Sequence, residues 1–551
     1  MTEPEPAPKT EPAPDERGGS TGAGRGVLFI AFAKFYFMAS GLFVQIRLPA
    51  ILSRGAFGSF SLVSSIASFV NNVVVTGTIQ TVSRFSVQNP GKAREVQAAG
   101  LRMHVRIGLP IAVAFIALAP LVSWLVLLDT SKTAPLMLAG LIMGGYSFYA
   151  VFVGTANGLH QFHKQAGLDI MFATLRVAGL IGMAMAGLGV VGVIGGWVAA
   201  VGVILCAAIV WVGLPRTGAR ERMPVRPLVR YFIGVAVYLT LFNALMFIDT
   251  ILIKRFATVY FSEHAHELAA SIDRVWPAAT GTSSWPVRVS GYFAKATDLA
   301  DVQNAYYAAV QNVARLSYQA IIAATFVIFP LISRSTFTED KETTRGYIRV
   351  TSRYSLVFAM AISVVMAANP ADMLGLVYAQ DYVELGATAL VPLALGNVAF
   401  SMFAINGTIL NSAGLTRPAV VVAAIAVTVS IVGNWIAIPI AIEHDCTLEV
   451  AASVSAGAMG VAAVASGWIM YRKLGAFVPL ASFVRIAIAT FSSLAVGRVV
   501  PFHGKLMTLV EAVIVGLTFL VVLIATRELG PRDLQAIKAV RKKRAAGGAE
   551  P

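Results

Sequence analysis

The chain has 551 residues with a formal net charge of +15, and 57% of its residues are hydrophobic while 13% are charged. Soluble domains carry about 25% charged residues, so this composition excludes an ordinary soluble multidomain protein. The apolar residues form long blocks and the basic residues lie in short connections between them. This distribution is typical of a polytopic membrane protein and excludes a nucleic-acid-binding one.

Residues 1–26 are rich in Pro, Glu and Ala and have neither an apolar core nor a basic n-region. They predict a disordered cytoplasmic leader rather than a signal peptide.

About fourteen apolar stretches follow, each close to the ~20 residues that a helix needs to cross a bilayer. They predict an all-α polytopic membrane protein with about fourteen transmembrane helices. The predicted spans are 27–48, 58–82, 107–128, 136–156, 168–188, 190–214, 231–253, 314–333, 354–369, 387–411, 419–441, 451–471, 482–499 and 508–526.

Basic residues concentrate on alternate connections between the spans. This asymmetry predicts that both termini are cytoplasmic. The cytoplasmic side then holds Arg84, Lys92, Arg94, Arg102, Arg106, Arg216, Arg220, Arg222, Arg226, Arg230, Arg334, Lys341, Arg345, Arg349, Arg353, Arg472, Lys473 and the basic tail 527–551.

The predicted outer segment 257–311 is longer than the other connections and is polar and aromatic. Long segments are translocated largely regardless of charge, so its cations agree with the predicted orientation. We predict that it starts as a loop insertion and that, from Gly291, it becomes a long helix running to Pro330.

The run Gly154-Thr155-Ala156-Asn157 closes the fourth span and Gly407-Thr408-Ile409-Leu410-Asn411 closes the tenth. This similarity favours a six-plus-six repeat, which in transporters places the substrate path between the halves. The predicted division is a leader at 1–26, lobes at 27–230 and 231–473, two extra helices at 474–526 and the basic tail at 527–551.

A few spans carry a charge within the membrane. Lys34 lies in the first span, Arg176 in the fifth, and Asp249 near Lys254 at the end of the seventh. A charge at the bilayer centre costs about 2.5–3.5 kcal/mol on insertion scales and usually faces a polar cavity. Asp249 and Lys254 are expected to form a switchable pair or an interfacial salt bridge.

The alternative for Lys34 is snorkelling to the inner interface. Arg47 and Arg54 flank the outer end of the first helix, where they would either close an outer gate or anchor the interface. The predicted substrate groove comprises Lys34, Arg47, Arg54, Arg84, Arg176, Asp249 and Lys254.

Motifs of soluble enzymes carry no weight in this chain. Gly187–Gly192 matches a dinucleotide fingerprint but lies between two membrane spans without a strand before it, so small-residue packing explains it. Glu263–Glu267 contains two histidines, which we interpret as a polar loop rather than a metal cluster. Cys206 and Cys446 lie in an apolar span and a polar loop, so no disulfide is expected. We therefore expect no cofactor, no metal and no enzymatic activity.

Several motifs, in order and spacing, resemble bacterial polysaccharide flippases of the Wzx type. They cover most of the chain after Gly26. The matching runs are Leu52–Leu62 with Thr76-Gly77-Thr78 and Ser83-Arg84-Phe85, then Phe329–Arg334, Leu376–Tyr382, Leu410–Arg417, Asn434 with Pro439, and Glu528-Leu529-Gly530 with Asp533-Leu534. Two departures are the long stretch 257–289 and the charges at Lys34 and Arg176, which match no signature position.

The resemblance implies the fold of the multidrug/oligosaccharidyl-lipid/polysaccharide flippase superfamily: two pseudo-symmetric six-helix lobes that open alternately to each side, plus two C-terminal helices. The implied cargo is an undecaprenyl-pyrophosphate-linked oligosaccharide moved from the inner to the outer leaflet, and the implied location is the cell inner (cytoplasmic) membrane. Implied partners are this lipid-linked substrate, the bilayer, and a polysaccharide polymerase with its export machinery. A cationic, hydrated groove fits such a cargo because desolvating pyrophosphate and sugars costs many kcal/mol.

Two other functions stay open. A multidrug or cation antiporter of the same superfamily would favour acidic groups in its lumen, whereas cations exceed acids in mid-span here. A membrane polysaccharide polymerase or ligase would use 257–311 as its active-site segment, with Arg274 or Arg288 as an essential residue.

Overall fold

The computed structural model describes residues 19–159, 161–215, 223–264, 296–319, 321, 341–499 and 504–530, and every regular element in these ranges is a helix. Within them, 12 helices are long and apolar enough to cross a membrane. They correspond to twelve of the predicted spans, which confirms an all-α polytopic membrane protein. The other two are 27–48, which lies within α1 (Gly19–Ile51), and 314–333, of which most lies outside the described residues. The total of fourteen stays a prediction.

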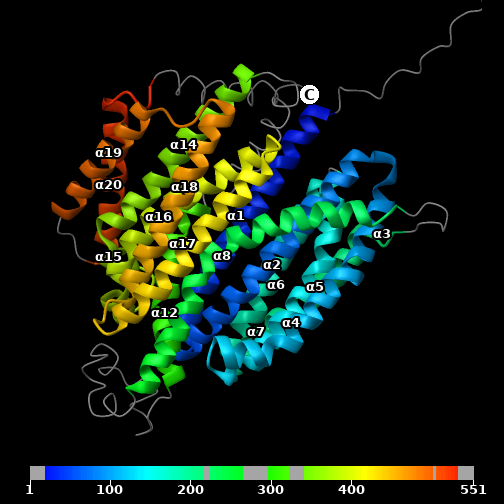
Figure 1. The fold of residues 1–551 in the computed structure, drawn as a ribbon, viewed down its shortest axis with the longest axis horizontal. Coiled ribbons are helices and arrows are strands. Elements are labelled where there is room, and N and C mark those ends of the chain that lie inside the picture. Colours follow the sequence, from blue (N-terminus) through cyan, green and yellow to red (C-terminus); the bar gives the residue numbers. More distant parts are fainter. Residues whose placement is uncertain are drawn as a thin grey trace, which may run out of the picture.

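Helices before residue 213 pack mainly on one another, and we call them the N-terminal bundle. In it α1 packs on α6, α6 on α7, and α5 on α2, α4 and α7 (Figure 1). Its other elements are α2 (Arg54–Gln88), α3 (Ala93–Met103), a π-helical segment at His104–Gly108, α4 (Leu109–Leu121), a second π-helical segment at Val122–Val126, α5 (Thr133–Gly158), α6 (Phe162–Met185) and α7 (Gly189–Val212).

A second group, from residue 226 to residue 474, forms the C-terminal bundle, in which α18 packs on α16 and α17. Two further helices, α19 and α20, pack on each other and on α14. The elements are α8 (Arg226–Glu263), α12 (Ala296–Ala314), α14 (Lys341–Ala368), α15 (Pro370–Gly375), α16 (Gln380–Ser412), α17 (Thr416–Ile442), α18 (Thr447–Leu474), α19 (Leu480–Val499) and α20 (Lys505–Ala525). The internal repeat and the exact domain limits remain predictions.

The start of the long outer segment was predicted incorrectly, whereas its helical end agrees with the prediction. Residues 257–263 continue α8 as a helix instead of starting a loop, and α12 is helical from Ala296. The polar side chains Asp301, Asn304 and Gln311 are buried between other helices. The sequence did not reveal this burial, because Lys132 and Lys254, which contact Asp301, and Asp249, which contacts Gln311, lie far away along the chain. The expected helix from Gly291 to Pro330 is confirmed over α12, and both of its predicted ends lie outside the described residues.

The two bundles meet where α2 crosses α12 and where α2 runs beside α8. At the α12 crossing, a Cβ atom on Gly58 would lie 1.6 Å from the backbone oxygen of Asp301, so only glycine permits this approach. Along α8, the amide of Asn72 donates to Asn243 at 2.9 Å. Helix α2 is therefore the main element that joins the two bundles.

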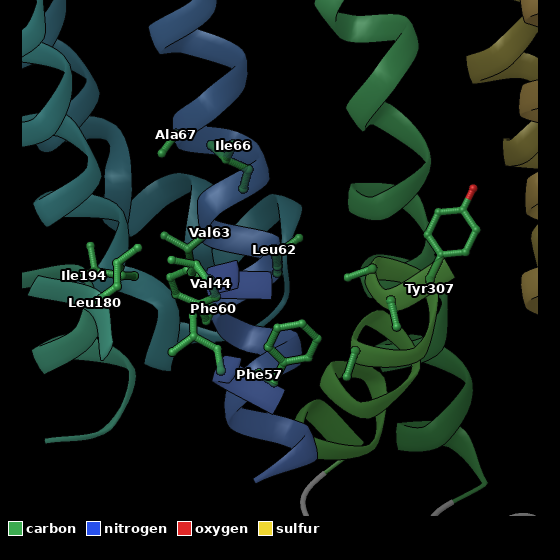
Figure 2. Packing of buried hydrophobic residues seen from close by; sticks show 14 of the residues in the cluster. Val44, Phe57, Phe60, Leu62, Val63, Ile66, Ala67, Leu180, Ile194 and Tyr307 are labelled. Atoms are coloured by element: carbon green, nitrogen blue, oxygen red, sulfur yellow. The ribbon is translucent and has the colours of Figure 1, made fainter. Parts of the chain in front are cut away.

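The buried core is continuous around α2. Phe57, Phe60 and Val63 on α2 belong to one hydrophobic cluster with Val44 of α1 and Leu180 of α6 (Figure 2). The same cluster includes residues of α8, α12 and α16, whereas a second cluster lies within the C-terminal bundle and its two extra helices. Apolar burial thus holds the bundles together on the α2 side.

Candidate functional site

Arg176 is the clearest candidate for binding an anion. It lies half-buried on α6, with its guanidinium 5.4 Å from the ring centroid of Phe37 and 5.2 Å from that of Trp197. The Trp197 indole is itself fixed, because its Nε1 donates to the Tyr146 hydroxyl at 3.2 Å. Among the described residues, no carboxylate pairs with Arg176. Its forked N–H donors are therefore held by aromatic rings while they stay available to an anionic ligand.

Lys34 has a partner that the sequence did not reveal. Its Nζ donates to Asp169 on α6 at 2.8 Å, and the Lys34 side chain is 32% exposed. Two residues further along α1 and five further along α6, the hydroxyls of Tyr36 and Thr174 are 2.9 Å apart. These contacts form a polar seam between α1 and α6, on which Arg176 also lies. The predicted cation is present, but a carboxylate already neutralises it.

Arg47 and Arg84 do not join this seam. Both are exposed, and the Arg84 guanidinium stacks 4.5 Å from the ring centroid of Tyr231 at the start of α8. Since Arg84 lies near the end of α2 and Arg54 at its start, the two are separated by the length of a transmembrane helix. The seven predicted groove residues therefore do not form one cluster.

Arg54 lies at the interface of the two bundles. Its Nε and Nη2 donate to the two carboxylate oxygens of Asp381 on α16, at 2.9 and 3.2 Å. Tyr306 on α12 donates to the same carboxylate at 3.3 Å. This bidentate pair joins α2 to α16 across the two bundles, and the gate role of Arg54 stays a prediction.

The expected pair of Asp249 and Lys254 is not formed. Residues five apart on an α-helix point about 140° away from each other around the axis, so they face different neighbours. Asp249 is buried and accepts hydrogen bonds from Tyr307 at 2.6 Å and Ser455 at 3.0 Å, from α12 and α18. Lys254 binds two other acids instead.

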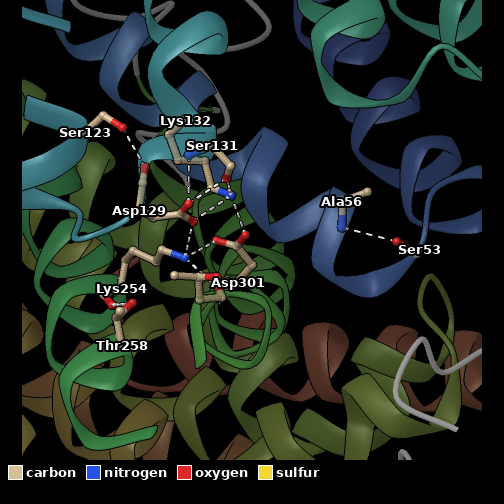
Figure 3. A network of polar contacts seen from close by, with 10 residues as sticks. Ser53, Ala56, Ser123, Asp129, Ser131, Lys132, Lys254, Thr258 and Asp301 are labelled. Carbon is tan, nitrogen blue, oxygen red and sulfur yellow. Dashed lines mark hydrogen bonds and ion pairs between the residues drawn. The ribbon is translucent and has the colours of Figure 1, made fainter. Parts of the chain in front are cut away.

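Those acids belong to a group of four charges that we call the ionic square. Lys254 of α8 contacts Asp129 at 3.0 Å and Asp301 of α12 at 2.8 Å, while Lys132 contacts the same two carboxylates at 2.9 and 2.6 Å (Figure 3). Asp129 and Lys132 come from the connection between α4 and α5. Burial disfavours the charged carboxylate of Asp129, but Lys254 and Lys132 outweigh it and hold the pKa of Asp129 well below its usual range.

Sequence reasoning missed six residues of these contacts: Asp129, Lys132, Asp169, Asp301, Arg315 and Asp381. Arg315 follows α12, donates to the backbone oxygen of Met246 at 2.7 Å and to Gln311 at 3.1 Å, and stacks on Phe247. It is the second residue of the predicted span 314–333, so the sequence placed it at a helix end, whereas in the structure it lies against the middle of α8. Lys34, which pairs with Asp169, lies 135 residues from it along the chain, and Lys132, which pairs with Asp301, lies 169 residues from it. No local sequence pattern therefore pointed to either acid.

The run Glu263–Glu267, predicted to be a polar loop rather than a metal cluster, is only partly described by the structure. Glu263 and His264 are at the end of α8, where the His264 ring stacks on Tyr260. Residues 265–267 lie outside the described residues. In the described part of the chain, no group of three or more His, Cys, Asp or Glu side chains is arranged to hold a metal ion.

Only the comparison of structures found proteins that are similar to this chain. No family model and no curated protein matches the sequence. A lipid II flippase, MurJ, in an inward closed conformation superposes with a TM-score of 0.66 at 12% identity, covering 91% of this chain and 99% of that one.

Two transporters of a second kind are also similar. An inward-facing multidrug resistance MATE family transporter of the MOP superfamily gives a TM-score of 0.55 at 13% identity, covering 80% of this chain and 94% of that one. A MATE transporter of Vibrio cholerae gives 0.51 at 15% identity, covering 82% and 96%. At such identities the likeness establishes a shared fold, the one that the sequence resemblance implied.

Proposed function

We propose that this protein is a flippase that moves undecaprenyl-pyrophosphate-linked oligosaccharide units from the inner to the outer leaflet of the cytoplasmic membrane. The observation that carries the proposal is Arg176, a mid-membrane cation held between two aromatic rings with no acid beside it in the described residues. A diphosphate offers the paired oxygen acceptors that suit a guanidinium fork. The fold shared with a lipid II flippase supports a lipid-linked cargo.

In this mechanism the two bundles rock about their contact along α2 and α8, so that the path between them opens to each side in turn. The head group passes between the bundles and meets Arg176 on the N-terminal side and Arg315 on the C-terminal side. The polyprenyl chain stays in the lipid. Because water is replaced by fixed cations and aromatic faces, the desolvation cost of the diphosphate is reduced.

A cation-coupled drug antiporter is the second candidate, and one observation favours it. Asp249 is a buried membrane carboxylate ringed by hydroxyl and amide groups, which is the kind of residue that binds a cation in transporters. The shared fold with MATE transporters agrees with this reading. Asp249 is compatible with the flippase too, as a coupling site, so Arg176 is the residue that separates the two functions.

The deciding experiment measures surface polysaccharide in a strain that lacks the protein and is complemented with variants. Parent protein should restore export, and Arg176→Ala should fail to do so at normal membrane abundance. Arg472→Ala is the matched control, because Arg472 also stacks on an aromatic ring, Trp468 at 5.1 Å, but at the end of α18. Full export by Arg176→Ala would overturn the proposal, and loss of drug resistance without loss of polysaccharide would favour the antiporter.

A further inference from the structure

The ionic square joins the two bundles at a single end of the molecule. Two of its four contacts cross between bundles: Lys254 to Asp129, and Lys132 to Asp301. The other two stay within one bundle, Lys132 with Asp129 and Lys254 with Asp301. All four side chains are at most 5% exposed, so water screens these contacts little.

The ionic square is charge-balanced within each bundle. Each bundle contributes one acid and one lysine, and each lysine lies within 3.0 Å of the acid on its own side. If the bundles separate, each half keeps an internal ion pair, and no buried charge loses its counter-ion. A conventional buried pair between two bodies would leave an uncompensated charge on each, which is strongly unfavourable.

The N-terminal half is held in shape by its own connection. The Ser123 hydroxyl donates to the backbone oxygen of Asp129, and one carboxylate oxygen of Asp129 accepts from the backbone N–H and the hydroxyl of Ser131. The other carboxylate oxygen is left for the two lysines (Figure 3). Leu128 has a φ of 55°, a left-handed conformation that fixes this turn at some cost in strain.

The neighbouring residue on α8 contacts the same connection. The Arg255 guanidinium donates to the backbone oxygens of Leu125 and Val126, at the end of the π-helical segment 122–126. Together with Arg54 and Asp381, these contacts place three separate polar links between the bundles at the end where α2 and α16 begin. By the predicted orientation, this is the outer end.

We infer that the ionic square is a charge-balanced latch that closes the outer end of the translocation path and that opens without stranding a buried charge. The inference rests on the proposed alternating-access function and names the device that controls one of its two gates. It predicts that neutralising one complete half unlatches the bundles while the other half stays internally paired. Asp129→Asn with Lys132→Met does so in the N-terminal bundle, and Lys254→Met with Asp301→Asn does so in the C-terminal bundle.

The reporter is a single cysteine at Ala308, in a background carrying Cys206→Ala and Cys446→Ser. Ala308 lies seven residues after Asp301 on α12, hence on the same helix face, and is 6% exposed. An impermeant thiol reagent added to intact cells should label Ala308→Cys slowly in the latched protein. Either half-square variant should raise the labelling rate about tenfold, because the outward-open population grows.

Asp298→Asn is the matched control. Asp298 lies one turn before Asp301 on the same helix, is exposed, and has no ion-pair partner among the described residues. Its labelling rate should equal that of the parent. Combining both half-square variants should add little to either alone, because the two halves form one latch. A purely structural square would instead give additive losses of membrane abundance with no change in labelling of the protein that remains.

An unchanged labelling rate in both half-square variants, at parental abundance, would overturn the latch. Labelling needs no cargo, so this result is independent of export. If the half-square variants are labelled faster but the parent protein does not restore polysaccharide export in the deletion strain, the latch is kept and the proposed cargo is rejected.

Discussion

Arg54 and Asp381 lie 327 residues apart, yet their side chains form a two-pronged ion pair, with Nε and Nη2 of Arg54 donating at 2.9 and 3.2 Å. The pair ties the first turn of α2 to the first turn of α16, and so one bundle to the other. Tyr382 adds a ring 5.7 Å from the guanidinium. In this state the Arg54 guanidinium is therefore paired with a carboxylate of the protein itself, whereas Arg176 has no such partner among the described residues.

Arg54→Ala should weaken the contact between the bundles and leave Asp381 unpaired. Removing one partner of a mostly buried pair costs about 3–5 kcal/mol, so the thermal midpoint of the purified protein should fall clearly. The exchange variant, Arg54→Asp with Asp381→Arg, should recover much of this loss. An exchange variant no more stable than Arg54→Ala would show that the pair itself contributes little.

Substitutions of Arg176 should reduce transport without reducing membrane abundance. Arg176→Ala removes a charge-assisted contact to the head group, at a cost of roughly 1–3 kcal/mol, or about fivefold to more than a hundredfold in transport rate. Arg176→Lys should be impaired less, because it keeps the charge and loses the fork. Surface polysaccharide per unit of membrane protein is the measurement, and equal values for the alanine and lysine variants would contradict a charge-based role.

Lys34→Ala should behave differently from Arg176→Ala because it strands Asp169. The Asp169 side chain is only 11% exposed, so loss of its partner should lower membrane abundance as well as export. Adding Asp169→Asn should restore abundance. If export stays low in the double variant, Lys34 has a transport role beyond its salt bridge, and if export returns with abundance, its role is structural.

The predicted orientation can be tested with single cysteines at two described positions in the Cys206→Ala, Cys446→Ser background. Gly91 is exposed and has open space around it, at the end where α2 finishes, and Glu443 is exposed in the turn after α17. An impermeant thiol reagent should label Glu443→Cys in intact cells and Gly91→Cys only after the membrane is permeabilised. The reverse pattern would invert the topology.

Stabilisation by Asp129 should be insensitive to mild acid. Because the folded-state pKa of Asp129 is lowered, its contribution is fully present above the unfolded value of about 3.9 and is lost only as the pH falls through the folded value. The groups facing it are Lys132, Lys254 and, across the square, Asp301. The difference in thermal midpoint between parent and Asp129→Asn should therefore stay constant from pH 8 to pH 5, and a difference that shrinks over this range would contradict the lowered pKa.

The amino-acid sequence by itself determined the membrane class, the helical fold and most of the spans. Apolar blocks of bilayer length carry this information locally, since a backbone in lipid must satisfy its hydrogen bonds within one helix. It also pointed to Arg176 as a candidate site residue, because an arginine in the middle of a span is costly to insert wherever its neighbours are.

Only the tertiary structure decided which charges are paired. Lys34 and Arg176 look alike in the sequence, but Asp169 neutralises the first and aromatic rings surround the second. Asp249 and Lys254 look like a pair, but their helix points them at different neighbours. Coulomb energy depends on distance in space, and helices packed side by side bring together charges that lie more than a hundred residues apart along the chain.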